Sequence, residues 1–284
     1  MFRNKKVLVT GADGMIGKEL VIELEERGAI ITKADKTTGQ DLRNFETCLK
    51  LCEGQDYVFH LAGVKGNPRM TKEKPADFMG PMLQFDTNMI IAANVQNVRR
   101  FLYTSSIAVQ NPRTDFYPAW AKKTAENLIK AMRTQGANTQ YCIVRPANVY
   151  GRFDNFARKE LMLVSDLIRK AKYSKLHKLP LEVWGDGSQE RDIINARDVA
   201  EAMIKTMCVM PDKPIRICTG KGVKVRWIAK EIADYFRLKI EYDTSKPTGD
   251  KRRVMKPNMG LIKFKPQIDL GFGIREVIEW KENH

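Results

Sequence analysis

The 284-residue sequence predicts an α/β protein with a Rossmann-type, doubly wound parallel sheet and a small C-terminal α/β lobe. Three features lead to this fold class. Short apolar stretches alternate with helical patterns through the first half, a glycine-rich turn joins the first stretch to the first helical pattern, and the regularity decreases after residue 150. Such alternation is typical of parallel strands connected by helices.

The N-terminal segment predicts a strand, a glycine turn and a helix in that order. Residues 7–9 (VLV) form a short apolar run, typical of a buried parallel strand. Apolar residues then recur at helical intervals until Gly28, and three glycines at G-x-x-G-x-x-G spacing separate the two patterns: Gly11, Gly14 and Gly17. This order predicts a cradle for the pyrophosphate of a dinucleotide, although a glycine triplet alone also fits an ordinary strand–turn–helix.

Each part of this cradle has a physical role. Gly11 permits the tight turn, Gly14 lets the backbone approach a phosphate, and Gly17 lets the helix pack closely on the sheet. Met15 and Ile16 begin the predicted helix, where free backbone N–H groups favour an anion. We therefore expect all five residues to contact the cofactor.

The second predicted strand, residues 29–34, ends at an acidic residue. Asp35 lies 18 residues after Gly17, close to the ~20 expected for the acid that binds the adenosine ribose of NAD. A carboxylate there repels a 2′-phosphate, so Asp35 favours NAD over NADP; the alternative is a solvated loop aspartate. Asp41 and Leu42 follow, and this pair could cap a helix or receive the adenine amine.

The remaining patterns divide the chain near residue 150. Before it, strands are predicted at 57–61, 100–105 and 140–145, with a helix within 75–97 and another at 120–135. After it, short strands (181–184, 215–218, 239–242) mix with helices (160–172, 197–207, 225–236). We expect a dinucleotide-binding domain over 1–150 and, over 151–284, mainly a substrate-binding lobe with some segments returning to the sheet.

Composition is that of a soluble enzyme. The hydrophobic content of 43% can form a core, and no apolar run approaches the ~20 residues of a membrane span. The chain begins directly with a strand, so we expect no signal peptide and a cytoplasmic location. Five cysteines without paired metal-ligand spacing indicate reduced thiols and no metal site, with Cys48 and Cys52 as packing residues on a helix.

The net charge of +15 is high, but lysines and arginines are spread along the chain. No basic repeat interleaved with aromatic residues and no helix-turn-helix pattern is visible, so we expect no nucleic-acid partner. A solvated positive surface would attract an acidic substrate such as a nucleotide diphosphate.

Five segments together resemble the extended short-chain dehydrogenase/reductase (NAD-dependent epimerase/dehydratase) family. They are TGADGMIG (10–17), FHLAG (59–63), TSSIAV (104–109), RPANVYG (145–151) and RDIINARDVA (191–200). Their order and spacing cover nearly the whole chain. The resemblance implies bound NAD, with NADP less favoured, and further cofactor contacts at Leu61, Ala62, Gly63, Thr104, Lys122 and Pro146.

Four further segments resemble the GDP-L-fucose synthase branch of that family: PADF (75–78), VYGRFDNF (149–156), VWGDGSQERD (183–192) and DTSKPTGDKRR (243–253). They imply a nucleotide-diphosphate sugar as substrate, with GDP as one candidate. The implied substrate contacts are Ser105, Asn148, Trp184, Arg191 and Arg252. A guanidinium suits this task because it forms paired hydrogen bonds with phosphate oxygens.

The resemblance implies a catalytic serine, and a tyrosine four residues before a lysine. Ser106 fits the serine, and Lys122 fits the lysine that binds the nicotinamide ribose. The position four before Lys122 is Pro118, however, and the nearest tyrosine is Tyr117. Because proline is tolerated in a first helical turn, Tyr117 is expected just outside the helix, from where it could still turn towards the site.

These features predict an NAD-dependent epimerase/dehydratase-type enzyme that acts on a nucleotide-diphosphate sugar. A GDP-L-fucose synthase-like epimerase-reductase is one alternative, although Ile107 and Ala108 follow Ser106 where that branch has a cysteine. The other alternative is a binding protein for NAD or a nucleotide sugar with weak or no catalysis, which the altered tyrosine–lysine spacing favours. The resemblance also makes a homodimer conceivable, through helices flanking the Lys122 segment.

Overall fold

The computed structural model describes residues 1–64, 73–110, 116–157, 161–246 and 249–284. Its centre is a six-stranded sheet in which every neighbouring pair is parallel. The strands lie in the order β2 (Ile30–Ala34), β1 (Lys6–Thr10), β3 (Tyr57–His60), β4 (Arg100–Thr104), β5 (Gln140–Pro146) and β10 (Ile215–Ile217). The order reverses between β1 and β3, which places the crevice for a ligand at the carboxyl ends of these two strands.

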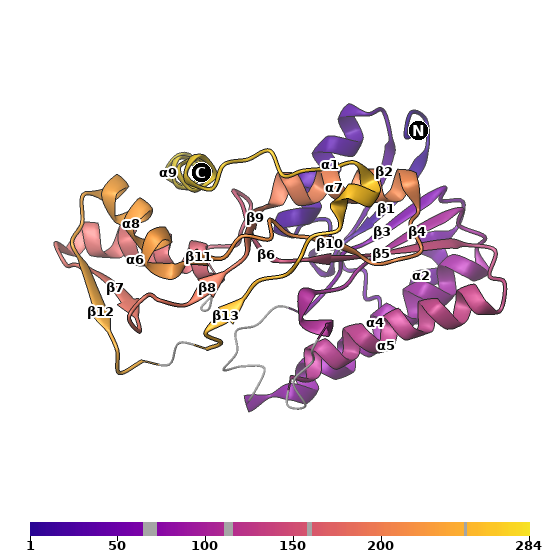
Figure 1. Cartoon of the computed structure of the whole chain (residues 1–284). Helices are drawn as coiled ribbons and strands as arrows, with labels where there is room; N and C mark the ends of the chain where they lie inside the picture. Colours follow the sequence, from indigo (N-terminus) through magenta and orange to yellow (C-terminus); the bar gives the residue numbers. More distant parts are fainter. Residues whose placement is uncertain (65–72, 111–115, 158–160, 247–248) are drawn as a thin grey trace.

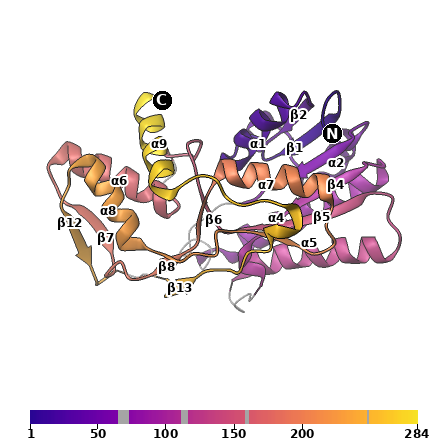
Figure 2. The ribbon, with the colours of Figure 1, turned by 45° about the horizontal axis from the view of Figure 1, so that its top comes forward.

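Helices cover both faces of this sheet (Figures 1 and 2). On one face lie α1 (Met15–Glu26) and α7 (Ala196–Val209), which pack against each other. On the other lie α2 (Phe45–Cys52), α4 (Pro75–Val95) and α5 (Tyr117–Thr134). Each face has its own apolar core, because a strand buried on both sides alternates its side chains between the two layers.

The second lobe lies beside one end of the sheet (Figure 1). Its core is formed by α6 (Leu163–His177), α8 (Val225–Phe236), α9 (Leu270–Asn283) and the parallel pair β7 (Leu181–Trp184) and β12 (Ile240–Asp243). Two small sheets connect it to the rest: β6 (Asn148–Tyr150) with β9 (Ile193–Asn195), and β11 (Val223–Lys224) with β8 (Glu190–Arg191) and β13 (Arg252–Arg253). The 3₁₀ turns are η1 (Lys36–Thr38), η2 (Ile107–Val109) and η3 (Met259–Ile262).

The predicted fold class is confirmed, and most predicted elements lie within a few residues of the observed ones. The strand at 181–184 and the helix at 225–236 have the predicted bounds. Strand β10 forms one edge of the central sheet and α7 packs on one of its faces, although both come from the second half of the chain. The patterns did not predict α9 or the two-residue strands, whose pairing partners are distant in sequence.

Helices α5 and α6 differ most from their predicted bounds. Helix α5 begins at Tyr117, and Pro118 occupies its first turn, where the missing N–H costs no hydrogen bond. The expectation that Tyr117 lies outside the helix is therefore wrong. Helix α6 continues to His177 rather than ending at residue 172, and Lys178 ends it in the left-handed conformation. None of the described helices combines the length and the apolar composition that crossing a bilayer requires.

Candidate dinucleotide and substrate site

The glycine turn has the geometry of a phosphate cradle. Gly11 has a φ of +69°, and a Cβ there would lie 2.9 Å from the backbone nitrogen of Ala62. A Cβ on Gly17 would lie 2.2 Å from the carbonyl oxygen of Gly11, so only glycine lets α1 pack this closely on the turn. Gly14 differs, because its Cβ would meet only that same oxygen, at 3.1 Å. The space above Gly14 is therefore open to a ligand.

Helix α1 presents its N-terminus to this open space. Gly14 is its N-cap, with extended backbone (φ −72°, ψ 163°) and no side-chain hydrogen bond to the first turn. The N–H groups of Met15 and Ile16 have no intrahelical acceptor, since the first turn of any helix lacks one. An anion here gains hydrogen bonds and the favourable end of the helix dipole.

Asp35 stands at the carboxyl end of β2, beside the glycine turn. Its carboxylate accepts hydrogen bonds from the backbone N–H groups of Asp13 (3.2 Å) and Thr37 (3.3 Å). The hydroxyl of Thr37 donates to the carboxylate of Asp13. The local chain thus fixes the Asp35 side chain at the place where the sequence predicts contact with an adenosine ribose.

Asp41 does not cap a helix. Its carboxylate pairs with the guanidinium of Arg43 at 2.6 Å, and this hydrogen bonding lowers the pKa of Asp41 to about 2. The N-cap of α2 is instead Asn44, whose side chain accepts from the N–H of Thr47. Of the two roles considered for Asp41, the capping role is therefore wrong. The neighbouring Leu42 is buried.

The end of β4 carries three consecutive hydroxyls. Ser106 caps η2, and its Oγ accepts the N–H of Ala108 at 3.2 Å. The hydroxyl oxygens of Thr104 and Ser105 are buried without a hydrogen-bond partner among the described residues. Because a buried hydroxyl without a partner is costly, these atoms indicate a position that a bound molecule would satisfy.

Lys122 and Tyr117 are in different environments. The ammonium of Lys122 lies 3.3 Å from the carboxylate of Asp86 and 4.7 Å from the ring centre of Tyr103, and the residue is 8% exposed. Tyr117, in the first turn of the same helix, is 42% exposed. Five residues correspond to about 500° of helix rotation, so the two side chains leave α5 in different directions. Tyr117 and Lys122 therefore do not form the tyrosine–lysine pair that the family resemblance implies.

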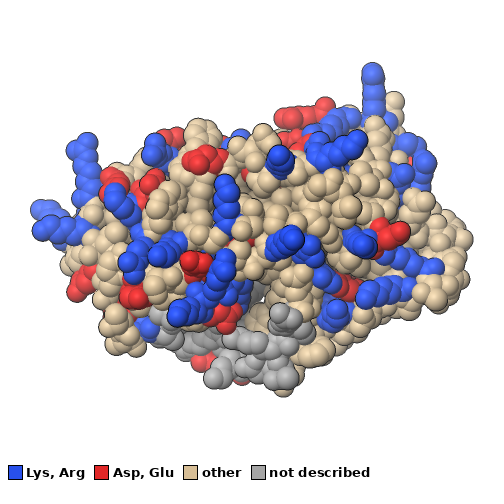
Figure 3. All heavy atoms as spheres, in the orientation of Figure 1, with Lys and Arg blue, Asp and Glu red and all other residues tan. Residues whose placement is uncertain are grey.

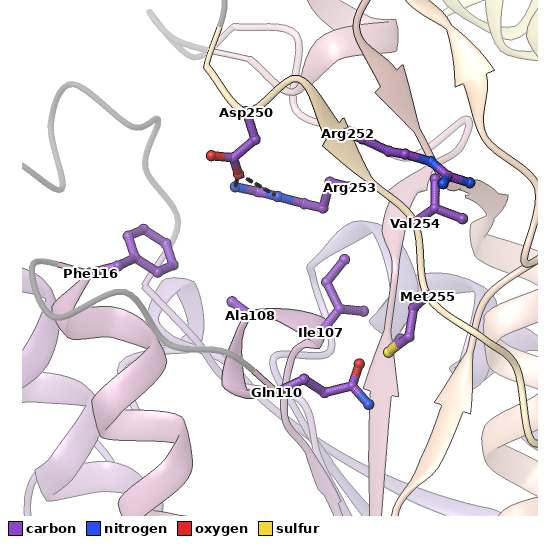
Figure 4. A pocket seen from close by; sticks show the side chains of 9 residues that line it. All are labelled: Ile107, Ala108, Gln110, Phe116, Asp250, Arg252, Arg253, Val254 and Met255. Atoms are coloured by element: carbon purple, nitrogen blue, oxygen red, sulfur yellow. Dashed lines mark hydrogen bonds and ion pairs between the residues drawn. The ribbon is translucent and has the colours of Figure 1, made fainter.

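A cavity of about 240 Å³ adjoins the serine segment. Ile107, Ala108, Gln110 and Phe116 line one side, and Asp250 and residues 252–255 line the other (Figure 4). Arg252 reaches Glu190 at 2.9 Å, and Arg253 pairs with Asp250. Of these lining residues, the sequence predicted only Arg252. Arg253 ends the DTSKPTGDKRR segment and could have been found by extending that argument by one residue.

Asn148 and Arg191 lie together in a second, smaller cavity. The amide of Asn148 donates to the carbonyl of Asp192 at 2.9 Å, and the guanidinium of Arg191 donates to the carbonyl of Asp250 at 2.7 Å. Burial, and secondarily the charge of Arg253, lower the pKa of Arg191. Arg191 therefore connects β8 to the segment that lines the larger cavity.

Trp184 is not brought to either cavity. It ends β7 in the outer part of the lobe, where its indole N–H donates to Glu182 at 2.6 Å and the Lys170 ammonium lies over its ring.

Figure 3 shows lysines and arginines over the whole visible face with acidic residues between them, so the positive charge forms no single patch there. Among the described residues, no group of three or more His, Cys, Asp or Glu could bind a metal ion.

The sequence matches the NAD dependent epimerase/dehydratase family over residues 7–213, and the chain belongs to that family. A GDP-L-colitose synthase from Yersinia pseudotuberculosis is 26% identical over 301 residues, covering 97% of each chain. The predicted family is thereby confirmed, and with it an enzyme that depends on NAD or NADP.

Two solved structures share the fold over essentially the whole chain. A GDP-6-OMe-4-keto-L-xylo-heptose reductase from C. jejuni has a TM-score of 0.88 at 22% identity, covering 100% of this chain and 99% of that one. A GDP-L-fucose synthetase from Naegleria fowleri bound to NADP has a TM-score of 0.85 at 20% identity, covering 100% and 94%.

Proposed function

We propose that this protein is an NAD-dependent enzyme of the epimerase/dehydratase type, and that its substrate is a nucleotide-diphosphate sugar. One observation carries the proposal: two hydroxyls at the β4 end are buried without partners among the described residues, the arginine-lined cavity adjoins the same segment, and the cradle at Gly14 follows β1 of the same parallel sheet. A dinucleotide in the cradle and a sugar in the cavity would meet at this point. The names of the relatives, a GDP-L-colitose synthase and a GDP-L-fucose synthetase, support a nucleotide sugar and make GDP one candidate nucleotide.

The bound cofactor supplies a nicotinamide that accepts or returns a hydride at a sugar carbon. The chain's own residues bind and orient the two reactants. In this mechanism the N–H groups of the glycine turn bind the pyrophosphate, Lys122 holds the nicotinamide ribose, and Ser106 holds the oxygen of the reacting sugar carbon. Arg191 and Arg252 bind the diphosphate, because guanidinium groups form paired hydrogen bonds with phosphate oxygens.

The proton step is assigned to Tyr117. It lies in the first turn of α5, exposed, and next to Phe116, which lines the large cavity. Its phenol could reach a ligand there without packing on Lys122. The separation of these two side chains is also what a binding protein with little catalysis would show. A binding protein for NAD or a nucleotide sugar is therefore the second candidate function.

Asp35 supports NAD(H) rather than NADP(H) as the preferred cofactor. The carboxylate is fixed at the end of β2 by two backbone N–H groups, and the carboxylate of Asp13 lies beside it. A 2′-phosphate placed between these groups would meet two like charges. The Naegleria fowleri structure is bound to NADP, so the proposed preference of this chain for NAD(H) rests on Asp35 and not on that neighbour.

The test begins with the purified protein. Any bound dinucleotide is released by denaturation and identified by mass spectrometry, and nucleotide sugars are then screened for thermal stabilisation in the presence of NAD(H) or NADP(H). A ligand at one hundred times its dissociation constant stabilises the fold by about 2.7 kcal/mol. Stabilisation by a nucleotide-diphosphate sugar, with turnover of the same sugar, supports the proposal. Stabilisation without any turnover supports the binding function, and no stabilisation by any dinucleotide contradicts both.

A further inference from the structure

A buried polar cluster connects five elements beneath the cradle. Asp86 on α4 is its centre and is fully buried. The ring of His60 lies 3.0 Å from the Asp86 carboxylate, the phenol of Tyr103 donates to it at 2.5 Å, and the ammonium of Lys122 lies at 3.3 Å. The other ring nitrogen of His60 lies 2.7 Å from the hydroxyl of Thr10. We call these five residues the Asp86 cluster.

The hydrogen bonds of the cluster fix its protonation. Burial disfavours an ionised Asp86, but Lys122 and the hydrogen bonds to the carboxylate outweigh it, so the pKa of Asp86 is lowered. Burial lowers the pKa of His60 by more than Asp86 raises it, so the ring is neutral. A neutral ring that donates from Nε2 to Asp86 accepts at Nδ1 from the Thr10 hydroxyl, whose oxygen in turn accepts the N–H of Ala62 at 3.3 Å.

The two ends of the cluster lie at the two ends of the candidate cofactor site. Thr10 directly precedes Gly11, and the Ala62 nitrogen lies only 2.9 Å from the place where a Gly11 Cβ would stand. At the other end, the Lys122 side chain keeps 10% exposure and is therefore not sealed from a ligand. One continuous set of contacts thus runs from the glycine turn to the lysine assigned to the nicotinamide ribose.

We propose that Asp86 is a positioning residue for the cofactor, acting through Lys122; this rests on the proposed function. A lysine ammonium is a point charge on a flexible four-carbon stem, and an unanchored one loses conformational entropy when it binds. Asp86 anchors it before the cofactor arrives, and the contacts through His60 and Thr10 hold that anchor in register with the glycine turn. Asp86 itself touches no ligand in this arrangement.

The experiment is a double-mutant cycle on dinucleotide affinity. Asp86→Asn keeps the volume of the side chain but removes its charge, and Lys122→Met removes the ammonium but keeps most of the stem. The dissociation constants of NADH and NADPH are measured by fluorescence titration for the unmodified protein, both single variants and the double variant. We expect Asp86→Asn to weaken binding about tenfold, which is within the range for residues in direct contact. In the Lys122→Met background, the same change should have no further effect.

A matched control separates positioning from general destabilisation. Asp198 is also a buried aspartate, but it accepts the N–H groups of Gln267 and Ile268, away from the site. Asp198→Asn should lower the urea midpoint while leaving dinucleotide affinity unchanged. If Asp86→Asn does not fold, Tyr103→Phe replaces it, because it removes one donor to Asp86 and leaves the ion pair between Asp86 and Lys122 in place. Its smaller loss of affinity should also vanish in the Lys122→Met background.

Two results overturn the inference alone: full affinity in folded Asp86→Asn or Tyr103→Phe protein, or a loss that is as large with Met at position 122 as with Lys. Failure of the unmodified protein to bind any dinucleotide overturns the proposed function and this inference together.

Discussion

Substituting Gly14 tests the cradle most directly, because the structure separates its binding role from any folding role. A Cβ at Gly14 meets a single atom at 3.1 Å, and the backbone there is extended, a conformation that any residue adopts. The side chain of Gly14→Val therefore enters the space reserved for the pyrophosphate, and the Gly11 carbonyl oxygen needs to shift only by a few tenths of an ångström to admit the Cβ. We expect the free energy of unfolding to change by less than about 1 kcal/mol.

The loss of binding should be much larger. A hydrogen bond from a backbone N–H to a charged phosphate oxygen contributes about 1.5–3 kcal/mol, so excluding one such contact weakens affinity roughly 10–150-fold. Affinities for NADH and NADPH are measured by fluorescence titration, and stability by urea unfolding. Gly80→Ala is the matched control, since a Cβ there meets nothing within 4 Å, and it should change neither affinity.

Gly17→Ala provides the contrast. Its Cβ would stand 2.2 Å from a carbonyl oxygen of the turn, so α1 must move off the sheet. We expect a loss of about 1–3 kcal/mol of stability from overpacking. If Gly14→Val protein folds with unchanged dinucleotide affinity, or if Gly17→Ala is as stable as the unmodified protein, the assignment of the cradle is refuted.

Four further predictions use the same purified protein. Asp35→Ala should weaken NAD(H) binding and narrow its advantage over NADP(H), and a preference for NADP(H) in the unmodified protein would contradict the role of Asp35. Arg191→Ala and Arg252→Ala should each weaken nucleotide-sugar binding by about 1.5–3 kcal/mol with NAD(H) affinity nearly unchanged; an equal loss of NAD(H) affinity would mean that they serve the cofactor or the fold. Tyr117→Phe should reduce turnover at least ~10²-fold with substrate affinity preserved, and unchanged turnover would exclude the tyrosine as the acid. The depressed pKa of buried His60 adds stability that is present above its ordinary value of 6.5 and is lost as the pH falls; urea unfolding at a series of pH values should show this slope, and His60→Gln, if folded, should flatten it.

The sequence by itself determined the parts of the protein that depend on neighbouring residues. The glycine spacing defined the turn, because each glycine meets an atom of the turn itself or of the strand beside it. Alternating strands and helices defined the parallel sheet. The motif segments indicated Asn148, Arg191 and Arg252, which the structure places in two cavities. Trp184 was predicted as a substrate contact by the same kind of argument. The local sequence of β7 could not predict on which side of the lobe that strand would lie.

Only the tertiary structure decided which distant segments meet. Phe116 and Arg253 line the same cavity, although they are far apart in the sequence and no local pattern marks them as a pair. Lys122 pairs with Asp86, which lies on a different helix. The helical pattern of the sequence alone could not predict whether Asp86 is buried or exposed. A charge is buried only where packing brings a partner within a few ångströms, and that distance is set by how α4 and α5 dock on the sheet, not by the residues next to it in the chain.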